Sequence, residues 1–211
     1  MPRDGTETRE RLLDAAERLA LGQGFSATTV DQVVAEARSS KGAFFHHFAS
    51  KNDLGRALVA RYAAADIAAL RRFMASAERR SDDPAIQLVE FVRGFEEIGD
   101  EIADEHQSSC LYASFVHHRE LTSDGSTEVI VEAIEAWRAA IADKLAAAAV
   151  RGSLQEGIDL DDLADHVFVT FEGAFILARA LRDTSQMRAQ LRILRQTLEA
   201  LLGVTPVESR A

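Results

Sequence analysis

The sequence is poor in the residues that build disulfide-rich, fibrous or membrane-spanning proteins. It has one cysteine, Cys110, three prolines among 211 residues, and no run of 18 apolar residues. A single cysteine excludes an intramolecular disulfide framework, and without a long apolar run we expect no membrane-spanning helix. The first twelve residues are charged and lack the apolar centre of a secretion signal. We therefore expect a cytoplasmic protein.

Apolar residues make up 47% of the chain and charged residues 27%, which is the composition of a globular protein with a substantial core. No segment shows the two-residue alternation of a half-buried strand, whereas apolar residues recur at three- and four-residue spacing. We predict an all-α protein of about nine helices, one of them over residues 85–105. A polar stretch that ends at Pro84 is the clearest internal break.

Residues 29–48 carry the most informative pattern. Thr29 and Gln32 have the spacing of a capping box, which marks a helix start. After a short break, a second helix follows in which Phe44 and Phe48 lie one turn apart and face inward. A short helix with a buried stripe and a small polar outer face is typical of one that enters the DNA major groove, which admits a single α-helix. The pattern predicts a helix-turn-helix motif.

The run Ser-Lys-Gly-Ala-Phe-Phe-His-His-Phe, followed by Ser-Lys, resembles the DNA-binding domain of the tetracycline-repressor (TetR-like) family of bacterial regulators. The resemblance covers residues 6–66. The remainder, residues 67–211, resembles the family only as a helical ligand-binding and dimerisation domain. The resemblance implies a homodimeric transcription regulator, usually a repressor, that binds a palindromic operator and is released by a small molecule.

The resemblance also indicates which residues contact DNA. The family usually has tyrosine at the position of Phe45, so a phosphate hydrogen bond is missing here, although Phe45 can touch a thymine methyl group. The family prefers Gly-Val where this chain has Arg38–Ser39, and Arg38 can supply the missing backbone contact. The expected DNA-binding residues are Thr28, Thr29, Arg38, Ser39, Ser40, Lys41, Gly42, Ala43, Phe45, His46, His47 and Lys51.

The formal net charge of −10 is unevenly distributed. Residues 1–54 contain seven Lys/Arg and eight Asp/Glu, a balance of −1, so the rest of the chain carries −9. Charges farther apart than about 8–10 Å are largely screened at physiological salt. The acidic excess is therefore compatible with DNA binding, but a near-neutral reading domain predicts few phosphate contacts.

Aromatic side chains at helical spacing occur throughout the C-terminal half, and two interpretations stay open. They form a packed helical core, or together they line an apolar ligand cavity. The candidate ligand-binding residues are Phe91, Phe95, Cys110, Tyr112, Phe115, His118, Trp137, Phe171 and Phe175.

The last two predicted helices, residues 161–182 and 185–202, are amphipathic. The first is too apolar to face water on more than a narrow side, and leucines of the second supply a matching stripe. The family dimerises through this region, which would place two recognition helices about 34–36 Å apart. The alternative is that these helices bury their apolar residues only against their own chain. The expected interface residues are Phe168, Phe171, Ala174, Phe175, Ala178, Leu191, Leu194 and Leu198.

Three other functions remain possible. His106, Cys110 and His117 or His118 could form the metal site of a hydrolase. Cys110 could be a redox or electrophile sensor, which requires an accessible thiolate. The chain could also be a ligand-binding helical dimer whose DNA-binding domain has decayed. Because the sequence lacks a nucleophile elbow, a phosphate loop, a His-Glu-x-x-His motif and a dinucleotide fingerprint, we expect no enzyme, no metal and no cofactor.

Overall fold

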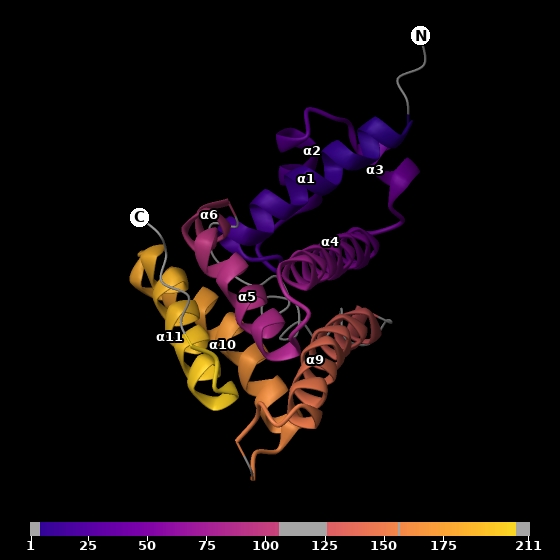
Figure 1. The fold of residues 1–211 in the computed structure, drawn as a ribbon. Coiled ribbons are helices and arrows are strands. Elements are labelled where there is room, and N and C mark those ends of the chain that lie inside the picture. The colour runs from indigo at the N-terminus through magenta and orange to yellow at the C-terminus, as the bar shows by residue number, and fades with distance from the viewer. Residues whose placement is uncertain (1–4, 106–125, 156, 206–211) are drawn as a thin grey trace. The chain divides into compact units, whose positions relative to one another are not determined.

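The computed structural model describes residues 5–105, 126–155 and 157–205, and these parts of the chain confirm the all-α prediction. They contain nine helices and no strand (Figure 1). The helices are α1 (Gly5–Gln23), α2 (Val30–Glu36), α3 (Lys41–His47), α4 (Lys51–Arg80), α5 (Pro84–Glu97), α6 (Gly99–Glu105), α9 (Ser126–Val150), α10 (Leu160–Leu181) and α11 (Ser185–Leu202).

The helix predicted over residues 85–105 is divided into α5 and α6. The break lies at Ile98, whose φ of −104° and ψ of 11° leave the helical region. Gly99 follows at once, and a Cβ added there would lie 3.1 Å from the backbone nitrogen of Arg188 in α11. Glycine therefore allows the backbone of α11 to approach closely at the break, a tertiary contact that helical periodicity does not reveal.

The described residues divide into two compact units. Unit 1 contains residues 5–65 and 126–132, and unit 2 contains residues 66–105 and 133–205 except residue 156. Helices α4 and α9 each contribute residues to both units. No helix in these parts of the chain has the length and apolarity needed to cross a membrane.

The core of unit 1 forms where α1, α2 and α3 pack together with the first turns of α4. Leu12 and Leu13 of α1, Phe44 of α3, and Leu54 and Leu58 of α4 are almost fully buried. Fully burying side chains of this size contributes about 1.5–3 kcal/mol each before the entropy cost of folding. The buried face of α3 is thus held in place by the apolar core that it shares with α1 and the first turns of α4.

An arginine on α4 also fixes α1. The Arg61 guanidinium contacts Asp14 at 2.6 Å and Glu10 at 3.4 Å, and it hydrogen-bonds Glu17 as well. Burial alone would lower the pKa of Arg61, but hydrogen bonds and charge interactions with Asp14 and Glu17 outweigh it and raise that pKa above its ordinary value. One cation on α4 therefore neutralises an acidic face of α1.

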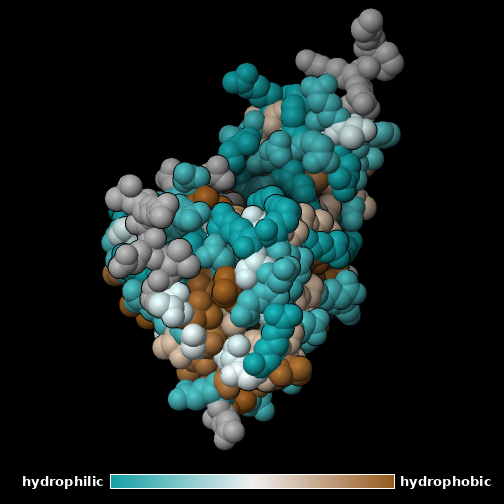
Figure 2. All heavy atoms as spheres, viewed as in Figure 1, coloured by the Kyte–Doolittle hydropathy of each residue, from teal (hydrophilic) through white to brown (hydrophobic). Residues whose placement is uncertain are grey.

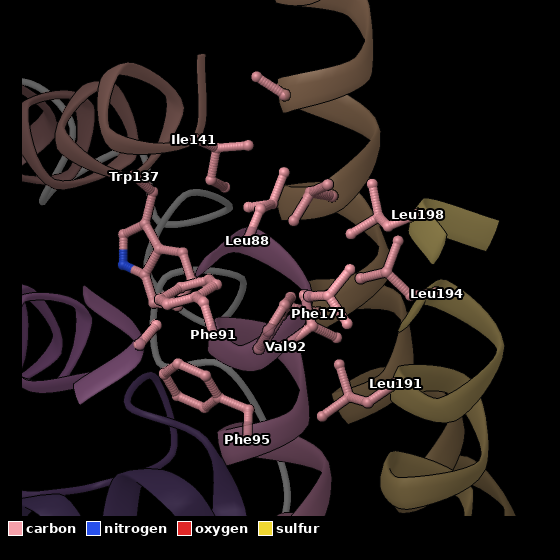
Figure 3. Close-up of a cluster of buried hydrophobic side chains, with 14 of the residues drawn as sticks. Leu88, Phe91, Val92, Phe95, Trp137, Ile141, Phe171, Leu191, Leu194 and Leu198 are labelled. Atoms are coloured by element: carbon pink, nitrogen blue, oxygen red, sulfur yellow. The ribbon is translucent and has the colours of Figure 1, made fainter. Parts of the chain in front are cut away.

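The core of unit 2 is an aromatic cluster surrounded by aliphatic side chains (Figure 3). Ring centroids lie 5.7 Å apart for Phe91 and Trp137, 5.1 Å for Phe95 and Phe171, and 5.3 Å for Trp137 and Phe171. These distances are typical of packed aromatic pairs. The Trp137 indole N–H donates to an Asp66 carboxylate oxygen at 3.0 Å, so the polar edge of the ring is satisfied.

A row of alternating charges joins the helices of unit 2. Successive N–O distances along it are 2.7, 2.9, 3.5, 2.6 and 2.6 Å, and we call it the charge ladder: Arg80, Glu90, Arg93, Glu199, Arg195 and Glu96. The Glu199 side chain, between two arginines, is only 5% exposed. The hydrogen bond to Glu96, with a second one to Glu199, raises the pKa of Arg195 above its ordinary value. The ladder therefore connects α4, α5 and α11 through ion pairs, and all of its members except Arg80 are largely buried.

Candidate nucleic-acid interface

Side-chain caps define where both motif helices begin. The Thr29 hydroxyl accepts from the Gln32 backbone N–H at 3.2 Å, and the Gln32 side chain accepts from the Thr29 backbone N–H at 2.8 Å. The predicted capping box is confirmed. Ser40 caps α3 in the same way, because its hydroxyl accepts from the Ala43 N–H at 3.1 Å. Each cap typically contributes about 1 kcal/mol.

Helix α3 has one buried face and one exposed face. Phe44 is fully buried, and Phe48, which follows the helix, is 2% exposed. Their ring centroids lie 5.7 Å apart. The opposite face is exposed at Lys41, Gly42, Phe45 and His46, while Ala43 and His47 are half-buried. Phe45 is 56% exposed, although phenylalanine side chains are most often buried. The helix therefore presents polar, basic and aromatic groups outward on a rigid base.

Thr28 corrects one expectation about the start of α2. Thr28 is 1% exposed, and its hydroxyl donates to the Gly24 carbonyl at 3.0 Å. A buried hydroxyl with an internal partner is not available to a phosphate, so Thr28 has a structural role in the loop. Thr29 is the exposed residue of the pair.

Two lysines expected at the interface have partners within the chain. The Lys41 ammonium lies 2.7 Å from an Asp31 carboxylate oxygen of α2. Lys51 donates to the Ser26 carbonyl at 2.9 Å and lies 4.9 Å from the centre of the Phe25 ring. The side chains of Lys41 and Asp31 are both more than 60% exposed, and ion pairs between exposed side chains contribute little to stability. Lys41 can therefore exchange its partner, whereas Lys51 is held against the loop before α2.

Arg38 occupies a strained position in the turn between α2 and α3. Its φ of 49° lies in the left-handed region, which non-glycine residues occupy at a cost of about 1–2 kcal/mol. Its side chain is exposed, and no hydrogen bond or ion pair holds it among the residues that the structure describes. The other Lys and Arg side chains of residues 5–65 all have internal partners: Arg9, Arg11, Arg18, Lys41, Lys51, Arg56 and Arg61. A free guanidinium in a strained turn marks Arg38 as a candidate contact residue.

The candidate ligand-binding residues have different surroundings. Phe91, Phe95, Trp137 and Phe171 pack against one another and are at most 6% exposed, so they form core contacts rather than the wall of an open cavity. Phe175 is half-buried against the same core. The other candidates lie outside the described residues: Cys110, Tyr112, Phe115 and His118, together with the metal candidates His106 and His117.

The expected dimer residues are mostly inside the chain's own core. Six of them are at most 7% exposed, namely Phe171, Ala174, Ala178, Leu191, Leu194 and Leu198. A side chain that unit 2 already buries has little surface left for a second chain, so these six residues contribute mainly to the chain's own core. Phe168 and Phe175 are half-buried and keep part of their rings at the surface.

The outward faces of α10 and α11 carry apolar residues that the sequence analysis missed. Val169 is 61% exposed, Ile176 55% and Ile193 55%, and nothing lies within 4 Å of a Cβ added at Gly173. Figure 2 shows apolar side chains among hydrophilic ones on the visible surface of the region that holds α5, α10 and α11, whereas the visible surface of α1–α3 is mostly hydrophilic. Val169, Gly173 and Ile176 are spaced four and three residues apart, so they form a second stripe along α10 at helical spacing. The sequence alone could not show which of the two stripes is buried.

Two family models match the chain. The model described as "Bacterial regulatory proteins, tetR family" matches residues 12–58, which contain the motif. The model described as "Transcriptional regulator LmrA/YxaF-like, C-terminal domain" matches residues 84–192, more than half of the chain.

Individual proteins are similar in sequence or structure to this chain over most of its length. The chain is 24% identical over 201 residues to the HTH-type transcriptional repressor DhaR of Mycobacterium sp. strain GP1, covering 95% of each chain. It is 24% identical over 178 residues to the transcriptional regulator AcuR of Cereibacter sphaeroides, covering 83% of this chain and 78% of AcuR. A TetR-family regulator from Agrobacterium tumefaciens has a similar structure, with a TM-score of 0.75 at 21% identity, covering 94% of this chain and 100% of that one.

The structure of reduced Escherichia coli NemR is similar as well, with a TM-score of 0.67 at 20% identity over 90% of this chain and 96% of that one. At these identities the structural similarity supports the fold, while the two family models cover both the motif and the C-terminal region. The chain belongs to the TetR family of transcriptional regulators.

Proposed function

We propose that this protein is a homodimeric repressor that binds a palindromic operator through α3 and is released when a small molecule binds within residues 67–211. The observation that carries the proposal is the two-sided geometry of α3, with Phe44 buried beneath it and Lys41, Phe45 and His46 exposed on it. A helix of this kind matches the width of the major groove. Arg38, Lys41 and Thr29 are the residues that we assign to backbone or base contacts.

Binding of DNA to this surface involves a change of partner at Lys41. Its ammonium must leave Asp31 to reach a phosphate or a guanine edge, and Asp31 then remains as an acidic group beside the interface. With a near-neutral motif region and few free cations, the affinity depends only moderately on salt. Specificity then depends mainly on base contacts from the outward face of α3.

A mobility-shift assay with the promoter next to the protein's own gene tests the proposal. We expect a retarded band at low salt that a Lys41→Ala variant weakens by about ten-fold for each half-site, and so by about 100-fold for the dimer, because each half-site loses one charged contact of about 1.5 kcal/mol. Arg79→Ala, which removes an exposed charge from α4 in unit 2, is the matched control and leaves the band unchanged. No retarded band with the wild-type protein at low salt would exclude DNA binding at this site.

Replacing Arg38 with glycine is expected to stabilise the protein while weakening DNA binding. Glycine adopts φ of 49° without strain, and after its greater unfolded-state entropy is counted the net gain is about 0.5–1 kcal/mol. Loss of the guanidinium removes about one phosphate contact per half-site, so the slope of log K against log salt becomes shallower by roughly two per dimer.

Arg38→Lys is the control for this substitution, because it keeps both the charge and the strained backbone. Urea unfolding and DNA titrations at several salt concentrations measure the two effects. An unchanged salt slope for Arg38→Gly would remove Arg38 from the set of phosphate contacts.

For dimerisation we propose the outward face of α10 and α11 and not the buried stripe expected from sequence. Val169, Ile176 and Ile193 provide exposed apolar area, and Gly173 permits a close approach of a second helix. A two-fold interface uses the same patch on both chains, so each of these residues contributes twice. Half-buried Phe168 and Phe175 extend the same surface.

Release of the operator requires a molecule that binds one arrangement of the dimer more tightly than the other. We assign its site to unit 2, and we assign to α4 the role of transmitting the effect. Helix α4 is continuous from Lys51, next to the motif, to Arg80 in the charge ladder.

A further inference from the structure

A groove of about 350 Å³ lies in unit 2 between the second half of α4 and the middle of α9. Its volume falls within the range of small-molecule sites, which runs from about 300 to 1,000 Å³. Most of its lining is apolar, and three of the lining residues are alanines, whose small side chains leave space for a ligand. The lining residues are Ile67, Leu70, Arg71, Met74, Ala75, Glu78, Ala136 and Ala140.

The two charged residues at the groove differ in their partners. Glu78 is neutralised, because the Lys144 ammonium lies 2.6 Å from its carboxylate, and Lys144 also donates to the Gln87 side chain at 2.7 Å. Arg71 is exposed and has neither an ion pair nor a hydrogen bond among the residues that the structure describes. The uncompensated charge at this groove is therefore positive.

We propose that the groove binds a small carboxylate with an apolar body, whose chain lies against the half-buried Ile67, Ala136 and Ala140 and whose carboxylate pairs with Arg71. Guanidinium groups recognise carboxylates through paired, charge-assisted hydrogen bonds. An apolar amine would instead meet an unpaired like charge at Arg71. The role of the groove as an effector site rests on the proposed function, because it requires that the protein binds DNA. The binding of a carboxylate in the groove does not depend on that function.

The groove is lined by the helix that follows the motif, and it lies near the tryptophan of the chain, Trp137. Six of its lining residues belong to α4, the helix that begins at Lys51 beside the motif. Ala136 of α9 is next to Trp137, the single tryptophan of the chain, whose indole donates to Asp66 of α4. A ligand between α4 and α9 changes the surroundings of this hydrogen bond, so tryptophan fluorescence reports occupancy.

Titration of the full chain without DNA tests the site, with octanoate, octan-1-ol and octylammonium as probes of the same apolar body and different head groups. We expect saturable fluorescence changes and the tightest binding for octanoate. Arg71→Gln is expected to weaken octanoate binding at least ten-fold, as the loss of a charge-assisted hydrogen bond implies, and to leave octan-1-ol unaffected. Arg79→Gln, the same change outside the groove on the same helix, is the matched control.

Ala140→Leu is expected to abolish binding of all three probes because the larger side chain fills the groove; circular dichroism checks that the variant is folded. Equal binding of octanoate and octylammonium, or octanoate binding that Arg71→Gln leaves intact, would overturn the proposal. The mobility shift without ligand tests DNA binding separately. Octanoate that binds but leaves the retarded band unchanged would overturn only the groove's role as an effector site.

Discussion

Replacing Glu199 with alanine is expected to destabilise unit 2 by about 3–5 kcal/mol. The Glu199 carboxylate lies 2.6 Å from Arg195 and 3.5 Å from Arg93, with its side chain 5% exposed. Removing it leaves Arg93 paired only with Glu90 and Arg195 paired only with Glu96, so the largely buried row keeps one excess positive charge. Removing one partner of a buried ion pair in this way is costly. For a chain of this size the loss corresponds to a fall in melting temperature of roughly 6–20 °C.

Thermal unfolding followed by circular dichroism measures this effect. Glu101→Ala, an exposed acidic residue on α6 in the same unit, is the matched control and is expected to change stability by no more than about 0.5 kcal/mol. Glu199→Gln keeps the shape and a hydrogen-bond acceptor, so its effect should be intermediate. A melting temperature for Glu199→Ala equal to that of the control would mean that the charge ladder contributes no stability.

If the protein forms the proposed dimer, replacing Ile176 with arginine is expected to convert it into monomers and to weaken binding to the proposed operator by at least about 100-fold. Ile176 is 55% exposed in the middle of the apolar face of α10, so the new charge is desolvated only when a second chain covers it. A two-fold interface would bury two such charges, and buried unpaired charges are very costly. Monomers lose the effective concentration that lets two linked heads bind two half-sites together.

Light scattering during size-exclusion chromatography measures the mass, and the mobility shift measures the affinity. Val150→Arg introduces the same charge at another exposed apolar residue, 89% exposed at the end of α9, and is expected to remain dimeric. Because Ile176 is exposed, the variant unit should stay folded. A dimer that persists in Ile176→Arg with unchanged operator affinity would place the interface elsewhere.

The motif was predictable because its signals are local. The hydroxyls of Thr29 and Ser40 satisfy backbone N–H groups only three residues away, so residue type and spacing suffice to locate both helix starts. The inward direction of Phe44 follows from helical periodicity in the same way. These interactions need no information from distant parts of the chain.

Contacts between distant segments were not predictable. Sequence could not distinguish Thr28 from Thr29, because only the fold shows that Thr28 points at the Gly24 carbonyl. It did not predict the charge ladder either, since Arg93 and Glu199 are far apart in the chain and meet only when α5 and α11 pack together. The strain at Arg38 depends on the backbone angle that the turn adopts.

The order of helices, the helix-turn-helix motif and the family followed from sequence alone, because caps and apolar periodicity act over a few residues. Which apolar stripe of α10 is buried, which arginines have partners, and where a groove opens between α4 and α9 were decided by the tertiary structure. A helix with apolar residues on two faces satisfies the same periodicity in either orientation. Only the helices packed around it determine which face is covered and which remains free for a partner.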